Sequence, residues 1–259
     1  MKSIKKMWEE RGRKFGRKIE GVLPKSWPKS LNYYLDEWMW ENVKEALSAD
    51  KTIKVLDLGC GYGRLSSKVL NYYPKARASG IDLAKSYVDL YNNDLSPRGK
   101  ALVGNIMNLP FKNQHFDVVF MVTTLMYLVE KKEQQKAINE IMRVLKKGGK
   151  FVIIERNPVG HSIINLFGLV QLIRGEKFKE IGSTSFSKTD FYSLIKPASG
   201  KINQVSGIPV FTLGFYFLFI LSKIKFEKLV LKIIKLTDQL FGSQLLTLSL
   251  YIAYSGYKR

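Results

Sequence analysis

The alternation of strand-like and helix-like segments between residues 53 and 155 is the feature that most constrains the fold of this chain. Short apolar runs typical of buried strands are separated by stretches with helical periodicity. A helix that connects two strands returns the chain to the same end of a sheet, so successive strands run parallel. The pattern predicts an α/β fold with a doubly wound, mostly parallel sheet of seven strands and helices on both faces. The expected strands are 53–58, 77–83, 101–106, 116–123, 150–155, 201–207 and 248–258.

Helices are expected between and around these strands. Gly12 and Gly16 weaken the helical propensity of the first segment. The run Lys-Lys-Gly-Gly at 146–149 is typical of a helix end. The expected helices are 5–23, 31–47, 62–72, 84–94, 131–147, 161–173 and 187–195.

The composition divides the chain into three parts. Residues 1–30 form a basic N-terminal extension, with ten Lys or Arg against three Glu and no apolar core of the secretory-signal type. Residues 31–207 and 246–259 supply the α/β domain. Residues 208–245 are predicted to form an apolar and basic helical cap inserted between strands six and seven.

The stretch VLDLGCGYGR, residues 55–64, places three glycines at alternate positions between a strand and a helix. Glycines there allow a ligand to contact the backbone, and the helix N-terminus adds N–H donors. The spacing differs from the G-x-G-x-x-G of dinucleotide enzymes. Asp82 ends the second strand, 25 residues after Asp57. A carboxylate at that position can accept both hydroxyls of an adenosine ribose, which predicts a nucleoside ligand.

Four segments resemble the successive motifs of class I S-adenosylmethionine-dependent methyltransferases, which have a Rossmann-like fold. They are VLDLGCGYG, GIDLA, GNIMNLPFKNQHFDVVF and EIMRVLKKGGKFVIIE, and the similarity covers about residues 50–157. The branch that they resemble acts on small molecules and includes the ubiquinone/menaquinone-biosynthesis methyltransferases. The resemblance implies S-adenosyl-L-methionine as cofactor and methyl transfer as reaction, and it says much less about the acceptor.

The resemblance also assigns these residues to parts of the cofactor. The family usually has Asp at the position of Asn105, whose carbonyl still offers an acceptor to the adenine amino group. Tyr34, with Tyr33, could close over the cofactor from the helix at 31–47. The implied binding residues are Asp57, Gly59, Cys60, Gly61 and Gly63 for the methionine part and its turn, Asp82 for ribose, Leu83, Asn105 and Ile106 for adenine, and Val122 and Thr123 beside the methyl donor.

A general base is expected if the acceptor is a hydroxyl or an ammonium group, since either must lose a proton. The candidates are His161, Tyr127 and Glu155. The single cysteine, Cys60, excludes an internal disulfide and a multi-cysteine zinc site. The only two histidines are 46 residues apart, so we expect no metal centre.

The cap insert gives the best indication of the acceptor. Residues 208–222 carry no charge but are too short to span a bilayer, which takes about 20 residues. Lys225, Lys228, Lys232 and Lys235 follow at helical spacing among apolar residues, and the chain has a net charge of +20. A basic amphipathic helix is typical of membrane-surface contact. We therefore expect a cytoplasmic protein that binds the inner membrane face peripherally and methylates a quinone precursor, a polyprenyl or a lipid-linked acceptor.

Three alternatives remain open from the sequence. The insert could be a cap that buries its apolar face on the sheet or on a second subunit. The lysines could hold RNA phosphates, although no Asn-Pro-Pro-aromatic or Asp-Pro-Pro-aromatic tetrapeptide of base methyltransferases follows the fourth strand. The chain could also bind the cofactor as a scaffold without turnover. The sequence makes no prediction of the oligomeric state.

Overall fold

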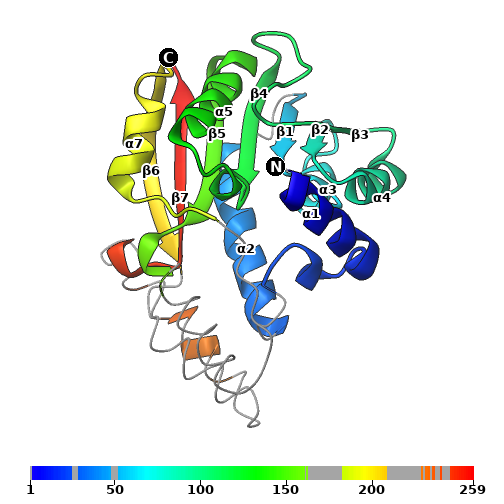
Figure 1. The fold of residues 1–259 in the computed structure, drawn as a ribbon, viewed down its shortest axis with the longest axis horizontal. Coiled ribbons are helices and arrows are strands. Elements are labelled where there is room, and N and C mark those ends of the chain that lie inside the picture. The colour runs from blue at the N-terminus through cyan, green and yellow to red at the C-terminus, as the bar shows by residue number, and fades with distance from the viewer. Residues whose placement is uncertain are drawn as a thin grey trace.

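The sheet has seven strands in the order β3-β2-β1-β4-β5-β7-β6, with helices on both faces (Figure 1). This computed structural model describes residues 2–24, 29–47, 52–160, 162, 183–208, 229, 231–233, 235–236, 240 and 246–259. The predicted α/β fold class is confirmed. The strands are β1 (Lys54–Leu58), β2 (Arg77–Asp82), β3 (Gly99–Val103), β4 (Phe116–Val122), β5 (Leu145–Arg156), β6 (Gly200–Ile208) and β7 (Tyr251–Lys258).

The directions of the strands show at which edge of the sheet a ligand can bind. The strands β1 to β5 pair in parallel, and β7 pairs antiparallel with both β5 and β6. It follows that β6 runs in the same direction as β1 to β5, as the sequence predicted. The carboxyl ends of these six strands therefore share one edge, where ligands bind in open α/β sheets.

The alternation of side chains along β1 shows why the sheet is covered on both faces. Val55 joins the core cluster that includes Leu35 and Met39 of α2 (Lys29–Ala46). Leu56, the next residue, joins the opposite cluster with Ile141 of α5 (Lys131–Val144). Both strand residues are fully buried. The remaining helices are α3 (Arg64–Tyr72), α4 (Lys85–Leu95) and α7 (Lys188–Ile195), and short 3-10 turns occur at Ile19–Gly21, Leu125–Tyr127 and Leu246–Leu248.

The first helix is shorter than predicted. It is α1 (Lys2–Phe15), and it ends because Gly16 adopts a left-handed conformation with φ of 55°. The Gly16 N–H donates to the carbonyl of Gly12 at 2.9 Å, which closes the helix end. Gly12 is tolerated inside the helix because Ser86 of α4 occupies the space that a side chain would need. The N-terminal residues therefore pack on α4.

Two further expectations for helices need comment. The helix predicted at 131–147 ends at Val144, because the next residue, Leu145, is fully buried and pairs with Phe116 at the start of β4. The glycines that predicted the stop lie within β5, where Gly148 has a φ of 72°. The helix predicted at 161–173 lies outside the described residues except for Ser162.

Candidate functional site

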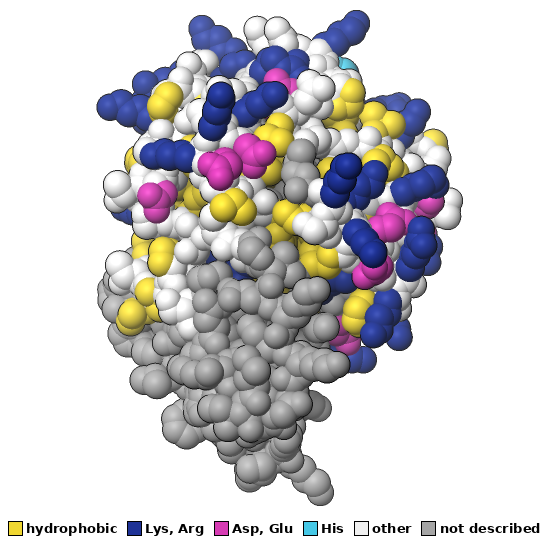
Figure 2. Space-filling view, viewed as in Figure 1, with side chains coloured by type: hydrophobic (Ala, Val, Ile, Leu, Met, Phe, Trp, Pro, Cys, Tyr) yellow, Lys and Arg dark blue, Asp and Glu magenta, His cyan; other side chains and the backbone are white. Residues whose placement is uncertain are grey.

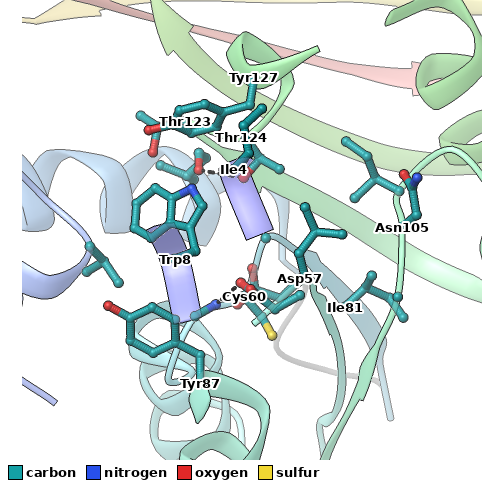
Figure 3. A pocket seen from close by; sticks show the side chains of 18 of the residues that line it. Ile4, Trp8, Asp57, Cys60, Ile81, Tyr87, Asn105, Thr123, Thr124 and Tyr127 are labelled. Atoms are coloured by element: carbon teal, nitrogen blue, oxygen red, sulfur yellow. Dashed lines mark hydrogen bonds between the residues drawn. The ribbon is translucent and has the colours of Figure 1, made fainter. Parts of the chain in front are cut away.

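A pocket of about 980 Å³, counted with its open mouth, lies at the carboxyl ends of β1, β2 and β4 (Figure 3). Its lining combines the glycine turn, the end of β2, the loop after β3, the end of β4 and residues of the N-terminal segment. Ten of the twelve predicted cofactor-binding residues line it: Asp57, Gly59, Cys60, Gly61, Asp82, Leu83, Asn105, Ile106, Val122 and Thr123.

The glycine turn exposes its backbone to the pocket because its positions exclude side chains. Gly59 and Gly61 have φ of 72° and 51°, in the left-handed region that favours glycine. A Cβ on Gly59 would lie 2.8 to 2.9 Å from side-chain carbons of Thr124. The N–H groups of Gly59 and Cys60 donate to the carbonyl of Ile81 at 2.8 and 3.1 Å, which ties the turn to β2. Gly63 precedes α3 and does not itself line the pocket.

Asp82 has the acceptor capacity that a ribose requires. Its two carboxylate oxygens each accept one backbone N–H, from Gly61 at 2.8 Å and from Ala84 at 2.9 Å. A carboxylate oxygen has two lone pairs, so each retains one acceptor position for a hydroxyl. Burial raises the pKa of this carboxyl, against the opposing effect of the backbone N–H groups of Ala84, Gly61 and Leu83. The side chain therefore fits the ribose of a nucleoside cofactor.

Asp57 and Cys60 complete the floor of the pocket. The Ser66 hydroxyl donates to Oδ2 of Asp57 at 2.8 Å, and burial raises the pKa of this carboxyl to about 7. Burial also raises the pKa of the Cys60 thiol. A protonated, buried thiol is a poor nucleophile.

Asn105 lines the pocket and also shapes its own loop. Its Oδ1 accepts the N–H of Met107 at 2.9 Å, and its backbone bridges to Asn108. An amide oxygen has two lone pairs and can accept two hydrogen bonds, so its chemistry also suits an amino group of a ligand. Ile106, which is 7% exposed, lies beside it.

The end of β4 is held in a strained conformation. Thr123 has a φ of 50°, which is uncommon for a residue other than glycine and concentrates at functional sites. The N–H groups of Thr124 and Leu125 donate to Oε1 of Glu155 at 2.9 and 2.7 Å. Glu155 is fully buried, its pKa is raised by burial to about 8, and it does not line the pocket. The structure thus places this catalytic candidate behind the pocket wall.

The structure treats three further predicted site residues differently: Tyr127, Tyr34 and His161. Tyr127 lines the pocket, and burial raises the pKa of its phenol despite the nearby guanidinium groups of Arg156 and Arg11. Tyr34 packs against the core cluster, and the Nζ of Lys235 lies 5.4 Å from its ring centroid. It is not among the pocket residues, unlike the prediction. His161 lies outside the described residues.

The N-terminal segment supplies a wall that the sequence analysis did not foresee. Ile4 and Trp8 of α1 line the pocket, and the indole of Trp8 lies between Tyr127 and Tyr87 (Figure 3). The ring centroids of Trp8 and Tyr127 are 5.7 Å apart, with the planes at 85°. Trp8 stands on the apolar side of the first helix in the sequence. No local pattern, however, shows that this side faces α4 and the pocket.

Hydrogen bonds hold α1 and the turn that follows it against α4. The backbone N–H of Ser86, in the first turn of α4, donates to Oε2 of Glu9 at 3.2 Å. The Ser86 hydroxyl donates to the Glu9 carbonyl at 3.2 Å, and the Tyr87 hydroxyl donates to the carbonyl of Gly21 at 2.7 Å. The carboxylate of Glu9 thus satisfies a donor at the α4 N-terminus that lacks a helical partner.

Arg64 is a second residue that sequence reasoning missed. It is the first residue of α3, directly after the glycine turn, and it lines the pocket. The signal was its place in the run Gly-Tyr-Gly-Arg at 61–64. Among the described residues, no group of three His, Cys, Asp or Glu could hold a metal ion.

In the part of the chain that the structure describes, no helix is both long enough and apolar enough to cross a bilayer.

Comparisons with known proteins agree with this geometry. The profile of a methyltransferase domain family matches residues 55–149. The sterol 4-C-methyltransferase strm-1 of Caenorhabditis elegans is 28% identical over 145 residues, which are 54% of this chain and 38% of that protein. The ubiquinone/menaquinone biosynthesis C-methyltransferase UbiE of Shewanella sediminis is 31% identical over 135 residues, 49% of this chain and 52% of that protein.

A solved structure shares the fold over most of the chain. The geranyl diphosphate C-methyltransferase of Streptomyces coelicolor A3(2), solved with Mg²⁺, geranyl diphosphate and S-adenosyl-L-homocysteine, gives a TM-score of 0.62 at 16% identity. The match covers 88% of this chain and 80% of that one. This chain spans about two fifths to one half of the two relatives above, so their activities do not transfer by similarity alone. The motifs, the domain match and the sheet nevertheless agree: residues 55–149 match a methyltransferase domain, and the chain has the α/β fold of the methyltransferase structures that it resembles.

Proposed function

We propose that this protein transfers a methyl group from S-adenosylmethionine to a hydrophobic small molecule, such as a quinone precursor, a polyprenyl or a lipid-linked acceptor. The observation that carries the proposal is one pocket in which residues of three of the four motifs meet, beside the end of β4. Beside the polar residues of the cofactor motifs, apolar and aromatic side chains form the other walls: Ile4, Trp8, Val22, Val122, Tyr127 and Leu128. Such a wall suits an apolar acceptor.

The cofactor, when bound, supplies an electrophilic methyl group on its sulfonium. In this proposal the residues of the chain align it: Asp82 accepts the ribose hydroxyls, and the exposed backbone of Gly59 and Gly61 faces the methionine part. Alignment of donor and acceptor is the main contribution that a protein makes to an in-line displacement. The strained end of β4 at Thr123 is then the rim that meets the acceptor.

Tyr127 is the described residue that we propose to contact the acceptor. Its phenol belongs to the pocket wall, and its raised pKa keeps it protonated at neutral pH. It would therefore donate a hydrogen bond to the acceptor rather than remove its proton. Glu155 would act through the backbone of Thr124 and Leu125 as a positioning residue. His161 stays a candidate base from the sequence alone.

A helical segment of the cap suggests where a hydrophobic acceptor comes from. Residues 229, 231–233, 235, 236 and 240 are helical. Leu231 packs against the core cluster, and Lys235 pairs with Glu37 of α2 at 3.1 Å. These two contacts turn the opposite side of the segment away from the domain. That side carries Leu229, Ile233, Leu236 and Leu240, which are 52 to 59% exposed.

An outward apolar face favours a membrane surface over a cap that buries this face on its own sheet. The four side chains recur at i, i+4, i+7 and i+11, which aligns them along one side of a helix. Lys232, which is exposed nearby, can meet anionic headgroups, where a lysine contributes about 1 kcal/mol. We propose that this face contacts an anionic membrane from which the acceptor is taken.

Charge distribution gives less support to an RNA substrate. Lys and Arg side chains are spread over the face in Figure 2 and are interrupted by Asp and Glu. Among the described residues on that face, they form no continuous basic track. RNA methylation is therefore kept as an outcome of the experiment that tests the proposal.

The test is transfer of radiolabelled methyl from S-adenosylmethionine into a host extract that is then separated into lipid, RNA, protein and polar-metabolite fractions. The Asp82→Ala variant is the control. We expect label in the lipid fraction, lost in the control. Label in RNA or in polar metabolites would refute the hydrophobic acceptor. Cofactor binding without label in any fraction would indicate a non-catalytic scaffold.

A further inference from the structure

Arg64 places a buried, under-satisfied cation in the wall of the cofactor pocket. Its side chain is 12% exposed and forms an ion pair with Asp36 of α2. Among the described residues, the one acceptor of its Nη2 is Sδ of Met39, at 3.7 Å. A thioether is a weak acceptor, so this end of the guanidinium lacks the strong partner that buried donors normally have.

Arg64 shares its carboxylate partner with a second cation. Asp36 also pairs with Lys68 at 2.7 Å, so one buried carboxylate faces two cations. The Lys68 side chain is 31% exposed and also has Glu37 and Glu41 nearby, so Arg64 is the buried cation of the two. Burial lowers the pKa of Arg64 to about 10, which still leaves it charged at neutral pH. Beside the pocket, Arg64 thus has only a share of one carboxylate among the described residues.

A buried charge that shares its counter-charge is costly to keep buried, and a ligand with a negative group at its free end lowers that cost. S-adenosylmethionine carries one anionic group, the carboxylate of its methionine part. The proposed placement of the cofactor puts the methionine part against the glycine turn, and Arg64 is the residue that ends this turn. Arginine also presents parallel N–H donors that match a carboxylate.

We propose that Arg64 binds the carboxylate of S-adenosylmethionine and that Asp36 orients its guanidinium for this purpose. The inference rests on the proposed function, because it assumes that the cofactor occupies this pocket with its ribose at Asp82. It assigns to α2 a role at the cofactor site, through Asp36, that none of the sequence motifs contains.

The test is a thermodynamic cycle between a side chain and a ligand group. Wild type and Arg64→Met are titrated calorimetrically with S-adenosylmethionine and with decarboxylated S-adenosylmethionine, which keeps the sulfonium and the amine. We expect Arg64→Met to weaken binding of the complete cofactor at least tenfold and binding of the decarboxylated one less than twofold. Such a difference isolates the contact between the guanidinium and the carboxylate.

Lys68→Met is the matched control, because it removes the other cation of the same Asp36. It is expected to change both affinities equally, by less than threefold. An equal loss for the two ligands in Arg64→Met, or no loss, would overturn the inference. If wild type binds neither ligand, the proposed function fails instead.

A second variant covers the case in which Arg64→Met does not fold. Arg64→Lys keeps the charge but loses the fork of donors, and we expect its preference for the carboxylated ligand to fall severalfold. An unchanged preference in Arg64→Lys would count against the proposed contact.

Discussion

At the scale of single residues, Asp82 joins the glycine turn to the proposed ribose site. Because its oxygens accept the N–H groups of Gly61 and Ala84, removal of the carboxylate both deletes ligand acceptors and loosens the turn. We predict that Asp82→Ala weakens S-adenosylmethionine binding at least about thirtyfold, since hydrogen bonds to charged groups contribute roughly 1.5–3 kcal/mol. Isothermal titration calorimetry measures this.

The matched control for that substitution is Asp89→Ala. Asp89 lies on α4, which also supplies Tyr87 to the pocket, its side chain is 53% exposed, and it pairs only with Lys85 among the described residues. Its removal should leave cofactor affinity within twofold of wild type. Equal losses in the two variants would show that Asp82 acts through general stability rather than through the ligand.

Glu155 gives the protein a stability that depends on pH. Burial raises its folded pKa to about 8, above the value of about 4.3 expected in the unfolded chain. Between these two values the folded state binds more protons, so stability is greatest below the lower value and falls as pH rises to about 8. The slope is at most about 1.4 kcal/mol per pH unit from this group.

We predict that Glu155→Gln removes this contribution. The amide oxygen can still accept the N–H groups of Thr124 and Leu125, and an amide does not ionise. The free energy of unfolding of the variant relative to wild type should therefore increase steadily from pH 5 to pH 8 in denaturant titrations. A difference that is constant over this range would show that Glu155 does not titrate as its burial implies.

At the scale of secondary-structure elements, α1 packs on α4 through a close contact at Gly12, and this packing brings the N-terminal residues to the pocket. A Cβ at this position would lie 3.1 Å from Cβ of Ser86 and 3.3 Å from Cδ2 of Tyr87. We predict that Gly12→Val displaces α1 from α4 and weakens cofactor binding about fivefold or more, because Trp8 then leaves the pocket wall. Tryptophan fluorescence during cofactor titration measures both effects.

Lys14→Val is the control for the Gly12 variant. It introduces the same β-branched residue into the same helix at an exposed position. It lowers helix propensity, whereas Gly12→Val does not, so it tests helix formation more severely than the Gly12 variant does. It should leave cofactor affinity unchanged. Equal weakening in both variants would place the effect in helix formation and not in docking.

The exposed face of the cap segment is testable by itself. We predict that the double variant Leu236→Gln and Leu240→Gln no longer sediments with anionic vesicles at high salt, because salt screens the lysines but not apolar insertion. The exposed Lys232→Gln variant should lose affinity mainly at low salt. Vesicle binding unaffected by the leucine changes would exclude this face as the membrane contact, and a wild-type dimer lost in the double variant would indicate a subunit interface.

Considered as a whole molecule, the fold could be predicted further than the site. The seven strands follow from apolar periodicity. The antiparallel direction of β7 leaves unchanged the alternation of its side chains between the two faces of the sheet. The position of Asp82 in the pocket could also be predicted, because a motif places it at a strand end. Trp8 and Asp36 could not, since each reaches the site through packing between helices far apart in the chain. Tyr34 was predicted to close over the cofactor, but it does not line the pocket. The reason is the same, because its ring packs against the core cluster and lies near the Nζ of Lys235.

The pocket joins parts of the chain from Ile4 to Leu128, so a bound cofactor should stabilise them together. At a ligand concentration a hundredfold above the Kd, binding to the folded state contributes about 2.7 kcal/mol. For a chain of this size that corresponds to a rise in Tm of roughly 5–10 °C. We predict this rise with S-adenosylhomocysteine, together with slower proteolysis at the exposed lysines and arginines of α1. If Tm rises while cleavage in α1 is unchanged, α1 is not part of the ligand site; if neither changes, the pocket does not hold the cofactor.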